Sequence, residues 1–191
     1  MSLGCLILNE YYLNTSDISS WVKNVNAGDR IFLSGIVYTS RDAAHKRIIE
    51  ALNSDAELPF DLDNAAIYYA GPTPTPDGLS IGSCGPTTSS RMDPYAPLLM
   101  DKGLKCMIGK GQRSNAVCDS IIKNGAVYLC AIGGAGALAA KSIVSCEVIA
   151  YDDLGCESVK KLEFKDFPLI VAIDSYGGNL YEKWYNKCLF E

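Results

Sequence analysis

Apolar positions along this chain recur with a period of two in some stretches and near four in others, which indicates strands and helices in turn. The strand predictions are residues 29 to 39, 64 to 70, 104 to 108, 126 to 132, 146 to 151, 159 to 164 and 169 to 175. The helix predictions are residues 41 to 52, 93 to 103, 114 to 123 and 135 to 143. Alternating elements with strand-only stretches at both ends favour a mixed α/β domain.

Polar caps, prolines and glycines mark the ends of these helices. Ser40 is expected to cap the first helix, and Asp93 the second, with Pro94 in its first position. Gly125 closes the third helix. The strand, helix and strand between residues 104 and 132 imply a parallel crossover.

Two segments interrupt the simple pattern. Gly35 stands at the centre of the first strand, where glycine marks a bulge or a close approach of another segment. Between Pro72 and Gly78 every second residue up to Pro76 is proline, which favours a stiff and extended loop. Such a loop suits the wall of a cleft, a subunit contact or a plain connector.

Length and composition narrow the class of protein. With 191 residues, of which 48% are hydrophobic and 20% charged, the chain is expected to form one globular domain. We place that domain at residues 27 to 185, between an unassigned arm at 1 to 26 and a tail at 186 to 191. A net charge of −5 argues against nucleic acid, no apolar run is long enough for a membrane, and a cytoplasmic location is expected.

Cysteines are numerous but scattered, and none forms a Cys-x-x-Cys pair. They are Cys5, Cys84, Cys106, Cys118, Cys130, Cys146, Cys156 and Cys188. The absence of a secretory signal makes disulfides unexpected. With a single histidine to assist, these cysteines predict no metal or cluster site formed by this chain alone.

Two segments place hydroxyl side chains and an arginine just before a helix. One is Gly85 to Asp93, with the sequence GPTTSSRMD, and the other is Ser34 to His45, with the sequence SGIVYTSRDAAH. Arginine grips a carboxylate with two parallel hydrogen bonds, and helix N-termini offer free N–H groups, so both segments suit a small dicarboxylate. Each alone also fits an ordinary capped helix, because Ser and Thr are preferred at such positions.

With the further segments Met107 to Gly111, Asp153 to Ser158 and Phe167 to Gly177, the chain resembles a known family. That family comprises the iron–sulfur-dependent hydro-lyases of the class I fumarase and L-tartrate dehydratase group, and the match is to their beta subunit or C-terminal region. The resemblance implies the swivelling β/β/α fold with a mixed sheet. It also implies reversible hydration of fumarate to malate or, alternatively, dehydration of L-tartrate.

The resemblance assigns roles to individual residues. Thr87 falls at the position of the proton-abstracting base, Thr88 lies beside it, and Arg41, Arg91 and Lys110 fall at substrate-binding positions. In this family a 4Fe–4S cluster belongs to an alpha subunit. The expected partners are therefore such a subunit and a small dicarboxylate, in an assembly built on a homodimer or a heterotetramer.

Other interpretations of single motifs remain open. Residues Gly134 to Ala139 imitate a nicotinamide-binding fingerprint, although the element that would cross over is too short. The glycines between Gly103 and Gly111 have the wrong spacing for a phosphate loop. His45 is either a general base or a structural histidine, and Arg47 is expected on a solvated face. A binding module without catalytic activity is a further alternative.

Overall fold

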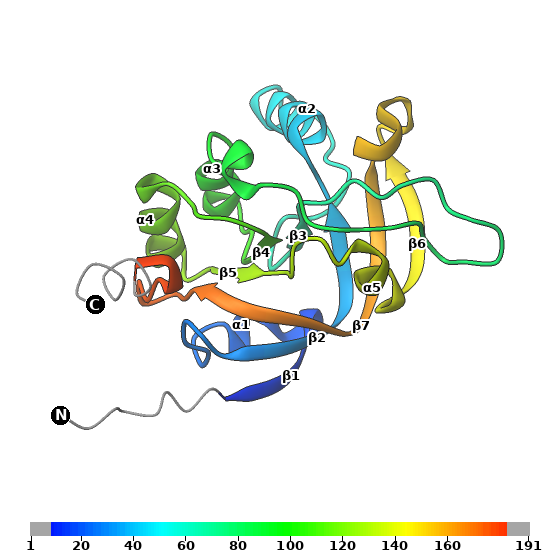
Figure 1. Ribbon diagram of the computed structural model, residues 1–191. Coiled ribbons are helices and arrows are strands. Elements are labelled where there is room, and N and C mark those ends of the chain that lie inside the picture. Colours follow the sequence, from blue (N-terminus) through cyan, green and yellow to red (C-terminus); the bar gives the residue numbers. More distant parts are fainter. Residues whose placement is uncertain (1–8, 183–191) are drawn as a thin grey trace.

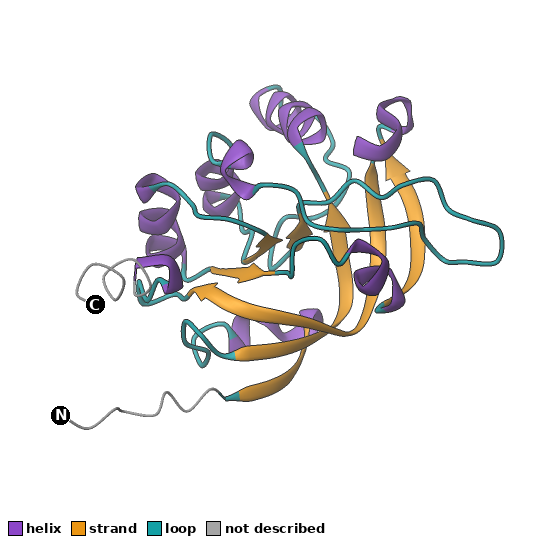
Figure 2. Ribbon diagram, in the orientation of Figure 1, coloured by secondary structure: helices purple, strands orange, loops and turns teal. Residues whose placement is uncertain are grey.

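Seven strands form one mixed sheet in the computed structural model, which describes residues 9–182 (Figures 1 and 2). The strands are β1 (Glu10–Asn14), β2 (Arg30–Thr39), β3 (Ala66–Tyr68), β4 (Cys106–Gly109), β5 (Val127–Cys130), β6 (Ile143–Ala150) and β7 (Val159–Ile173). The α-helices are α1 (Ile18–Trp21), α2 (Asp42–Asn53), α3 (Ala96–Asp101), α4 (Asn115–Asn124) and α5 (Gly136–Lys141). Three short 3-10 helices complete the fold: η1 (Thr15–Asp17), η2 (Ser89–Met92) and η3 (Asp152–Glu157).

The sheet closes into a ring because β2 and β7 are long enough to pair with several neighbours. One edge of β2 pairs in parallel with β1 and then with β3, while its other edge runs antiparallel to β7. β7 pairs on its far edge with β6 and then with β5. Parallel pairs join β3 to β4 and β4 to β5, which confirms the predicted crossover and the mixed α/β class.

Successive residues of the short parallel strands enter two different cores. Tyr68, Ile108 and Leu129 belong to an inner core with residues of β2 and β7. Their neighbours Tyr69 and Met107 belong to an outer core with residues of α2, α3 and α4, which cover this side of the sheet in Figure 1. Because side chains alternate across a strand, burial on both faces explains why these strands read as unbroken apolar runs.

Gly35 confirms the prediction made for the centre of β2. The register between β2 and β7 shifts between Leu33 and Gly35, and the φ angle of Gly35 is +103°. A Cβ atom there would lie 2.4 Å from Thr15 Oγ1 and 2.5 Å from Asn14 Oδ1. The position therefore combines a bulge with a close approach, and glycine alone satisfies both.

The predicted pair of final strands, 159 to 164 and 169 to 175, is wrong. β7 continues without a break from Val159 to Ile173. In the sequence, Asp166 and Pro168 are residue types typical of a turn between two strands. In the structure Asp166 has a φ of +48°, but the strand continues through it. β2 pairs with β7 on both sides of these residues, so the chain passes through an irregularity and does not reverse.

Part of the N-terminal segment that the sequence left unassigned belongs to the sheet. β1 pairs with β2 in parallel from Glu10 to Asn14. Ile18 and Trp21 of α1 are buried in the inner core, and Trp21 Nε1 donates to the Asn14 carbonyl at 2.8 Å. Only five residues long and half exposed, β1 carries too little apolar periodicity to be detected. The predicted tail at 186 to 191 lies outside the described residues.

Two helix starts differ from the predicted caps. Arg41 occupies the cap position of α2, and Ser40 Oγ instead lies 2.7 Å from His45 Nδ1. α3 begins later than expected, at Ala96, and the Asp93 carboxylate points toward a different helix. It accepts a hydrogen bond from the backbone N–H that precedes α4, at 2.7 Å. In both cases another hydrogen bond, local for Ser40 and long-range for Asp93, takes the side chain that the sequence pattern had assigned to a cap.

The proline-rich loop extends away from the sheet and passes beyond β6 in Figure 1. Residues 73 to 80 are exposed. Two hydrogen bonds join its stems: Thr73 N–H to the Ser83 carbonyl at 3.0 Å, and Ser83 N–H to Thr73 Oγ1 at 2.9 Å. Its role as a cleft wall or a subunit contact stays a prediction. No helix within residues 9–182 is long and apolar enough to cross a membrane.

Candidate active site

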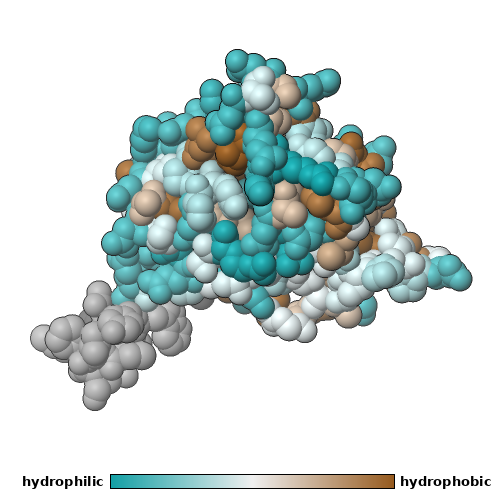
Figure 3. Space-filling view, turned by 90° about the horizontal axis from the view of Figure 1, so that it is seen from above, coloured by the Kyte–Doolittle hydropathy of each residue, from teal (hydrophilic) through white to brown (hydrophobic). Residues whose placement is uncertain are grey.

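The neighbouring parallel strands β2, β3 and β4 end at one edge of the sheet, and two of the predicted site residues, Arg41 and Lys110, follow these ends. Arg41 comes after β2, Gly71 after β3 and Lys110 after β4. Ligands of α/β proteins bind outside the carboxyl ends of such strands. Seen from above, the face that carries α2 is mostly hydrophilic, with separate hydrophobic areas (Figure 3).

The segment with two threonines crosses this edge and is fixed by backbone hydrogen bonds. Thr87 N–H donates to the Tyr69 carbonyl at 2.7 Å, and Thr88 forms a parallel bridge with Lys110. Ser89 N–H donates to the Lys110 carbonyl at 2.9 Å, and Lys110 N–H donates to Ser89 Oγ at 3.0 Å. The structure thus brings Thr87, Thr88 and Lys110 together on neighbouring backbone segments.

Ser89, which the sequence analysis did not single out, anchors this segment from below. Its side chain is buried, and Tyr128 Oη lies 2.9 Å from Ser89 Oγ and 2.9 Å from the Gly111 carbonyl oxygen. Burial raises the pKa of Tyr128, so its hydroxyl stays protonated and can donate. Gly109 allows the Ser89 side chain to pack against the end of β4, since a Cβ at Gly109 would clash with Ser89 Oγ at 2.0 Å.

Lys110 lies beside the glycine-rich loop that follows β5. A Cβ at Gly133 would lie 3.5 Å from Lys110 Cδ and 4.0 Å from Nζ. The lysine side chain therefore runs along a part of the loop that has no side chains. This placement leaves its ammonium group at the edge of the sheet, where a carboxylate can approach.

The nicotinamide interpretation of the loop at Gly134 to Ala139 is not supported by the topology. β6, which follows the loop, pairs antiparallel with β7, whereas a dinucleotide fold needs a parallel crossover at this point. Gly136 serves close packing, because a Cβ there would lie 2.4 Å from Ser83 Oγ and 3.0 Å from the Gly85 nitrogen.

Arg41 extends across Gly71 at the end of β3. A Cβ at Gly71 would lie 2.6 Å from Arg41 Nη1, so the absence of a side chain makes room for the guanidinium. Arg41 Nη2 is 3.5 Å from Glu157 Oε1, and Glu157 Oε2 accepts the Ala43 N–H at 3.0 Å. With 19% of its side chain exposed, Arg41 is held in place and remains accessible.

Arg91 is connected to the same place through Asp42. Its Nε lies 2.8 Å from Asp42 Oδ1, and about half of the Arg91 side chain, 51%, is exposed. Asp42 follows Arg41 directly in the chain. The edge thus carries three cations, Arg41, Arg91 and Lys110, against the two carboxylates of Asp42 and Glu157. The locally positive balance suits an anionic ligand on a chain whose net charge is −5.

Arg47, expected on a solvated face, forms an exposed ion pair with Asp153 at the surface. Its Nη1 donates to Asp153 Oδ1 at 2.7 Å, and its Cζ lies 5.3 Å from the centre of the Tyr151 ring. These hydrogen bonds raise the pKa of Arg47 and lower that of Asp153. Arg47 therefore points toward η3 and not toward the residues of the candidate site.

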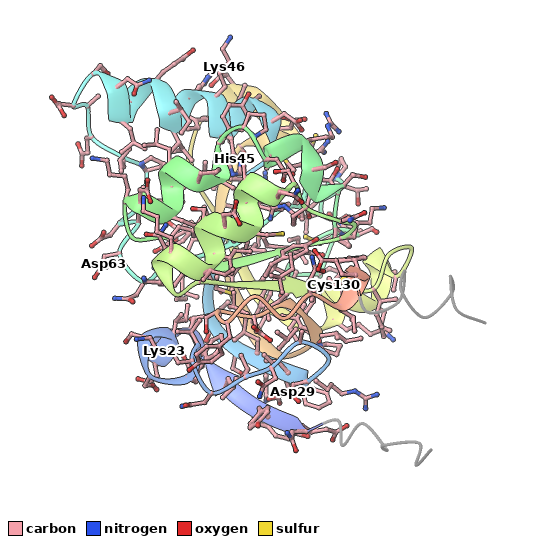
Figure 4. The ribbon with its side chains drawn as sticks, turned by 90° about the vertical axis from the view of Figure 1, so that its left-hand side faces the viewer. Lys23, Asp29, His45, Lys46, Asp63 and Cys130 are labelled. Atoms are coloured by element: carbon pink, nitrogen blue, oxygen red, sulfur yellow. The ribbon has the colours of Figure 1, made fainter. Side chains whose placement is uncertain are left out.

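His45 is fully buried, which excludes direct contact with a substrate in this structure. Burial lowers its pKa to about 4, so the imidazole is neutral at pH 7. Figure 4 shows His45 in the interior near α3, whereas the neighbouring Lys46 points outward. Of the two interpretations, the structure supports the structural histidine.

The described cysteines are free and do not gather. They are Cys84, Cys106, Cys118, Cys130, Cys146 and Cys156. Apolar surroundings raise the pKa of Cys84 and Cys106, which disfavours the thiolate needed for metal binding. Within residues 9–182 no group of three or more His, Cys, Asp or Glu side chains is placed to hold a metal ion. The described part of the chain therefore offers no ligand set that fits an iron–sulfur cluster.

The sequence of this chain is similar to a known protein family over nearly its whole length. The family model described as the fumarase C-terminus matches residues 8–184. This chain belongs to that family. The match covers the whole of the described region, so it includes the ring of strands and every predicted site residue.

Individual relatives of two kinds agree with the family. The anaerobic class I fumarate hydratase of Escherichia coli (strain K12) is 42% identical over 160 residues, covering 83% of this chain and 29% of that protein. Fumarate hydratase 2 of Leishmania major is 41% identical over 158 residues, covering 82% of this chain and 28% of that protein. The putative L(+)-tartrate dehydratase subunit beta of Methanocaldococcus jannaschii is 41% identical over 176 residues, covering 89% of this chain and 90% of that protein.

The two kinds of relative differ in how much of their length is matched. This chain spans less than a third of the fumarate hydratases but most of the tartrate dehydratase subunit. Both names denote hydro-lyases, and the chain is therefore a member of a hydro-lyase family.

Sequence reasoning missed several residues that organise the site. Asp42, Ser89 and Glu157 lie inside the segments that carry the family resemblance, but their contacts are with residues distant in sequence. Tyr128 and Arg113 carry no local signal, because one lies in an apolar strand and the other in a short polar loop. Pairing across the fold, which a linear pattern does not contain, gives these residues their roles.

Proposed function

We propose that this chain is the beta subunit of a class I hydro-lyase, or the equivalent part of one, and that it binds a four-carbon dicarboxylate for the hydration of fumarate to malate. The observation that carries this proposal is the gathering of Arg41, Arg91 and Lys110 beside Thr87 and Thr88 at the carboxyl edge of three parallel strands. An edge with excess positive charge and several hydroxyl groups matches the chemistry of a dicarboxylate.

In this proposal Arg41 and Arg91 hold a substrate carboxylate. Each guanidinium already faces an internal carboxylate, at 3.5 Å for Arg41 with Glu157 and at 2.8 Å for Arg91 with Asp42. These contacts fix the direction of each planar fork. The Nη groups of the half-exposed Arg91 side chain stay free for the ligand, whereas Arg41 Nε is buried and Arg41 can offer only its Nη groups. The orientation of the substrate is then set before reaction, which is the main contribution of such a clamp.

Thr87 is proposed as the group that accepts the proton next to the departing hydroxyl, with Thr88 as its hydrogen-bond partner. A threonine hydroxyl is a weak base unless nearby positive charge favours its ionised form. Lys110, which lies across the backbone bridge from Thr88, and Arg91 in η2 are the candidates for this charge. The same cations favour the negative charge that develops on the substrate.

The proposal includes an alpha subunit, or the corresponding part of a fused enzyme, as partner. We propose that this partner carries a 4Fe–4S cluster, which when bound supplies a Lewis acid for the substrate hydroxyl. The described residues of this chain hold no ligand set for it, so this chain contributes the clamp and the proton acceptor only.

The test is reconstitution. The purified chain would be combined with a class I alpha subunit whose cluster has been rebuilt without oxygen, and fumarate consumption would be followed by its ultraviolet absorbance. We expect hydration of fumarate only when both components are present. Tight binding of dicarboxylates without turnover in the complex would instead support the non-catalytic module, and a thermal shift with NAD alone would support the nicotinamide enzyme.

L-tartrate is the alternative substrate. The relative named as a tartrate dehydratase subunit is matched over 90% of its length, which favours a separate subunit of this kind. The reconstituted complex would therefore be assayed with L-tartrate and fumarate in parallel, and the ratio of the two kcat/KM values decides between them.

A further inference from the structure

Five buried side-chain polar atoms among residues 9–182 lack a hydrogen-bond partner, and all belong to residues around the start of α2 and the end of β3. They are Arg41 Nε, Asp42 Oδ2, His45 Nε2, Tyr69 Oη and Arg113 Nη2. Buried polar atoms are nearly always paired in folded proteins, either directly or through an ordered water. Their concentration at one place indicates a polar network and not a series of isolated defects.

The contacts of His45 fix which of its nitrogens carries the proton. His45 Nδ1 lies 2.7 Å from Ser40 Oγ and 3.1 Å from the Arg41 carbonyl oxygen. A carbonyl oxygen only accepts hydrogen bonds, so both contacts are favourable when Nδ1 carries the hydrogen. His45 Nε2 is then an acceptor that faces the protein interior and needs a donor.

Tyr69 and Arg113 are the donors beside it. The Tyr69 ring meets the His45 ring edge-on, with 5.4 Å between the ring centres. Arg113 Cζ lies 5.3 Å from the centre of the Tyr69 ring, and its side chain has no exposed surface. Burial raises the pKa of Tyr69, while the nearby charge of Arg113 acts in the opposite direction. The guanidinium thus lies near the Tyr69 hydroxyl, although neither Tyr69 Oη nor Arg113 Nη2 has a direct hydrogen-bond partner.

Arg113 is itself held rigidly. Its Nε donates to Asp93 Oδ1 at 2.7 Å, and its Cζ lies 5.0 Å from the centre of the Tyr128 ring. Tyr128 also holds Ser89 below the threonine segment. The charged groups that face the network are Arg113, Asp93 and Asp42. His45, which lies between them, is neutral at pH 7.

We propose that Arg113, Tyr69 and His45 form a hydrogen-bonded chain that positions Arg41 for the substrate carboxylate. Arg113 Nη2 donates to the Tyr69 hydroxyl and that hydroxyl donates to His45 Nε2, each through a bridging water, because none of these three atoms has a direct partner. His45 Nδ1 donates directly to the Arg41 carbonyl oxygen. The three are positioning residues. Their effect on catalysis rests on the proposed function, because it assumes that Arg41 binds the substrate.

The network itself is tested by nitrogen NMR on the full chain. His45 is the only histidine, so selective ¹⁵N labelling of histidine gives one pair of ring signals. We expect Nδ1 protonated, Nε2 unprotonated and shifted by an accepted hydrogen bond, and no titration between pH 5 and pH 8. A hydrogen on Nε2, or a histidine that titrates in this range, would overturn the chain without reference to any activity.

Tyr69→Phe and Tyr95→Phe form a matched pair of variants. Tyr95 also packs against the His45 ring, with 5.8 Å between ring centres, but its hydroxyl is not among the unpaired buried atoms. We expect Tyr69→Phe to move the Nε2 signal toward that of a free acceptor, and Tyr95→Phe to leave it in place. An unchanged Nε2 signal in Tyr69→Phe would remove Tyr69 from the network.

The positioning role has a separate readout in the reconstituted complex. Tyr69→Phe is expected to raise the KM for the dicarboxylate about tenfold and to leave kcat within a factor of about two, because the base is intact and Arg41 is less well oriented. Tyr95→Phe should change neither constant. If the NMR result holds but KM does not change, the network exists and does not position Arg41. If the complex has no hydro-lyase activity, the proposed function fails while the NMR result still decides the network.

Discussion

At the scale of single residues, the candidate site combines fixed backbone with side chains that keep part of their hydrogen-bonding capacity free. Arg41 shows this best, since Gly71 gives it space, Glu157 directs one side of its fork, and 19% of the side chain stays exposed. A guanidinium held in this way needs little reorganisation when a carboxylate binds.

Substitution of Arg41 tests the clamp. Arg41→Ala should lower the kcat/KM of the reconstituted enzyme by at least about thirtyfold, because losing a charged hydrogen bond to a ligand costs about 2–5 kcal/mol. Arg91→Ala should act in the same direction. Arg47→Ala is the control: it removes an arginine of the same helix that pairs with Asp153 at the surface, and its activity should stay close to wild type. Wild-type kinetics for Arg41→Ala would refute the assignment.

Replacement of Thr87 separates rate from binding. Thr87→Val keeps the shape of the side chain and removes its hydroxyl, so kcat should fall by at least about a hundredfold while KM changes little. Steady-state kinetics with fumarate would show this. A loss of substrate affinity with kcat intact would make Thr87 a binding residue and leave the proton acceptor unidentified.

The buried His45 predicts how stability depends on pH. Its pKa is about 4 in the folded chain against 6.5 in the unfolded one, so the unfolded chain binds more protons between these values. Stability from this group is complete above pH 6.5 and is lost as pH falls toward 4, by an amount on the order of 3 kcal/mol. Urea unfolding of wild type and His45→Gln at several pH values measures it. The difference between the two free energies of unfolding should shrink as pH falls, and a constant difference would contradict the assignment.

At the scale of elements, the sequence predicted most helices and strands because their apolar faces repeat regularly. β2, α2, β4, α4 and β5 appear within a few residues of their expected bounds. Asp166 and Pro168 misled the prediction of β7, since a bulge and a turn use the same residue types. The candidate site residues Arg41, Thr87 and Lys110 were predicted through the resemblance. Partners such as Glu157 were not, because their roles arise only when distant segments meet.

The junction of β4 with the threonine segment is expected to be intolerant of even one added methyl group. In Gly109→Ala the new Cβ would meet Ser89 Oγ at 2.0 Å and Tyr69 Cδ2 at 2.9 Å, and overpacking of this kind costs about 1–3 kcal/mol or more. Gly133→Ala is the matched control, since its nearest contact would be an ordinary 3.5 Å to Lys110 Cδ. Thermal unfolding should show a clear loss of Tm for the first variant only, and equal Tm values would contradict the packing described.

At the scale of the whole molecule, the candidate site lies on an open edge and not in an enclosed cavity. The pockets between β1, β2 and β3 and between α1, α4 and β7 lie away from Thr87, Arg41 and Lys110. Substrate binding that excludes water therefore requires a second surface, which the proposed alpha subunit would provide.

The isolated chain should consequently be incomplete. We expect it to purify without colour or iron, to bind dicarboxylates weakly, and to show no turnover of fumarate. Iron analysis, calorimetric titration with malate and a steady-state assay on the chain alone provide the measurements. Robust activity without a partner or added iron would exclude the two-component proposal.

The long strand β7 has a consequence for how this molecule folds. Among the described strands it comes last in the sequence. It pairs with β2 along one edge and with β5 and β6 along the other. Until it emerges from the ribosome, these strands have open edges, and such edges pair readily with other chains. Closure between segments more than a hundred residues apart also makes folding slow. Nascent chains that stop before Val159 should therefore depend on chaperones, and truncations there should aggregate, not fold partially.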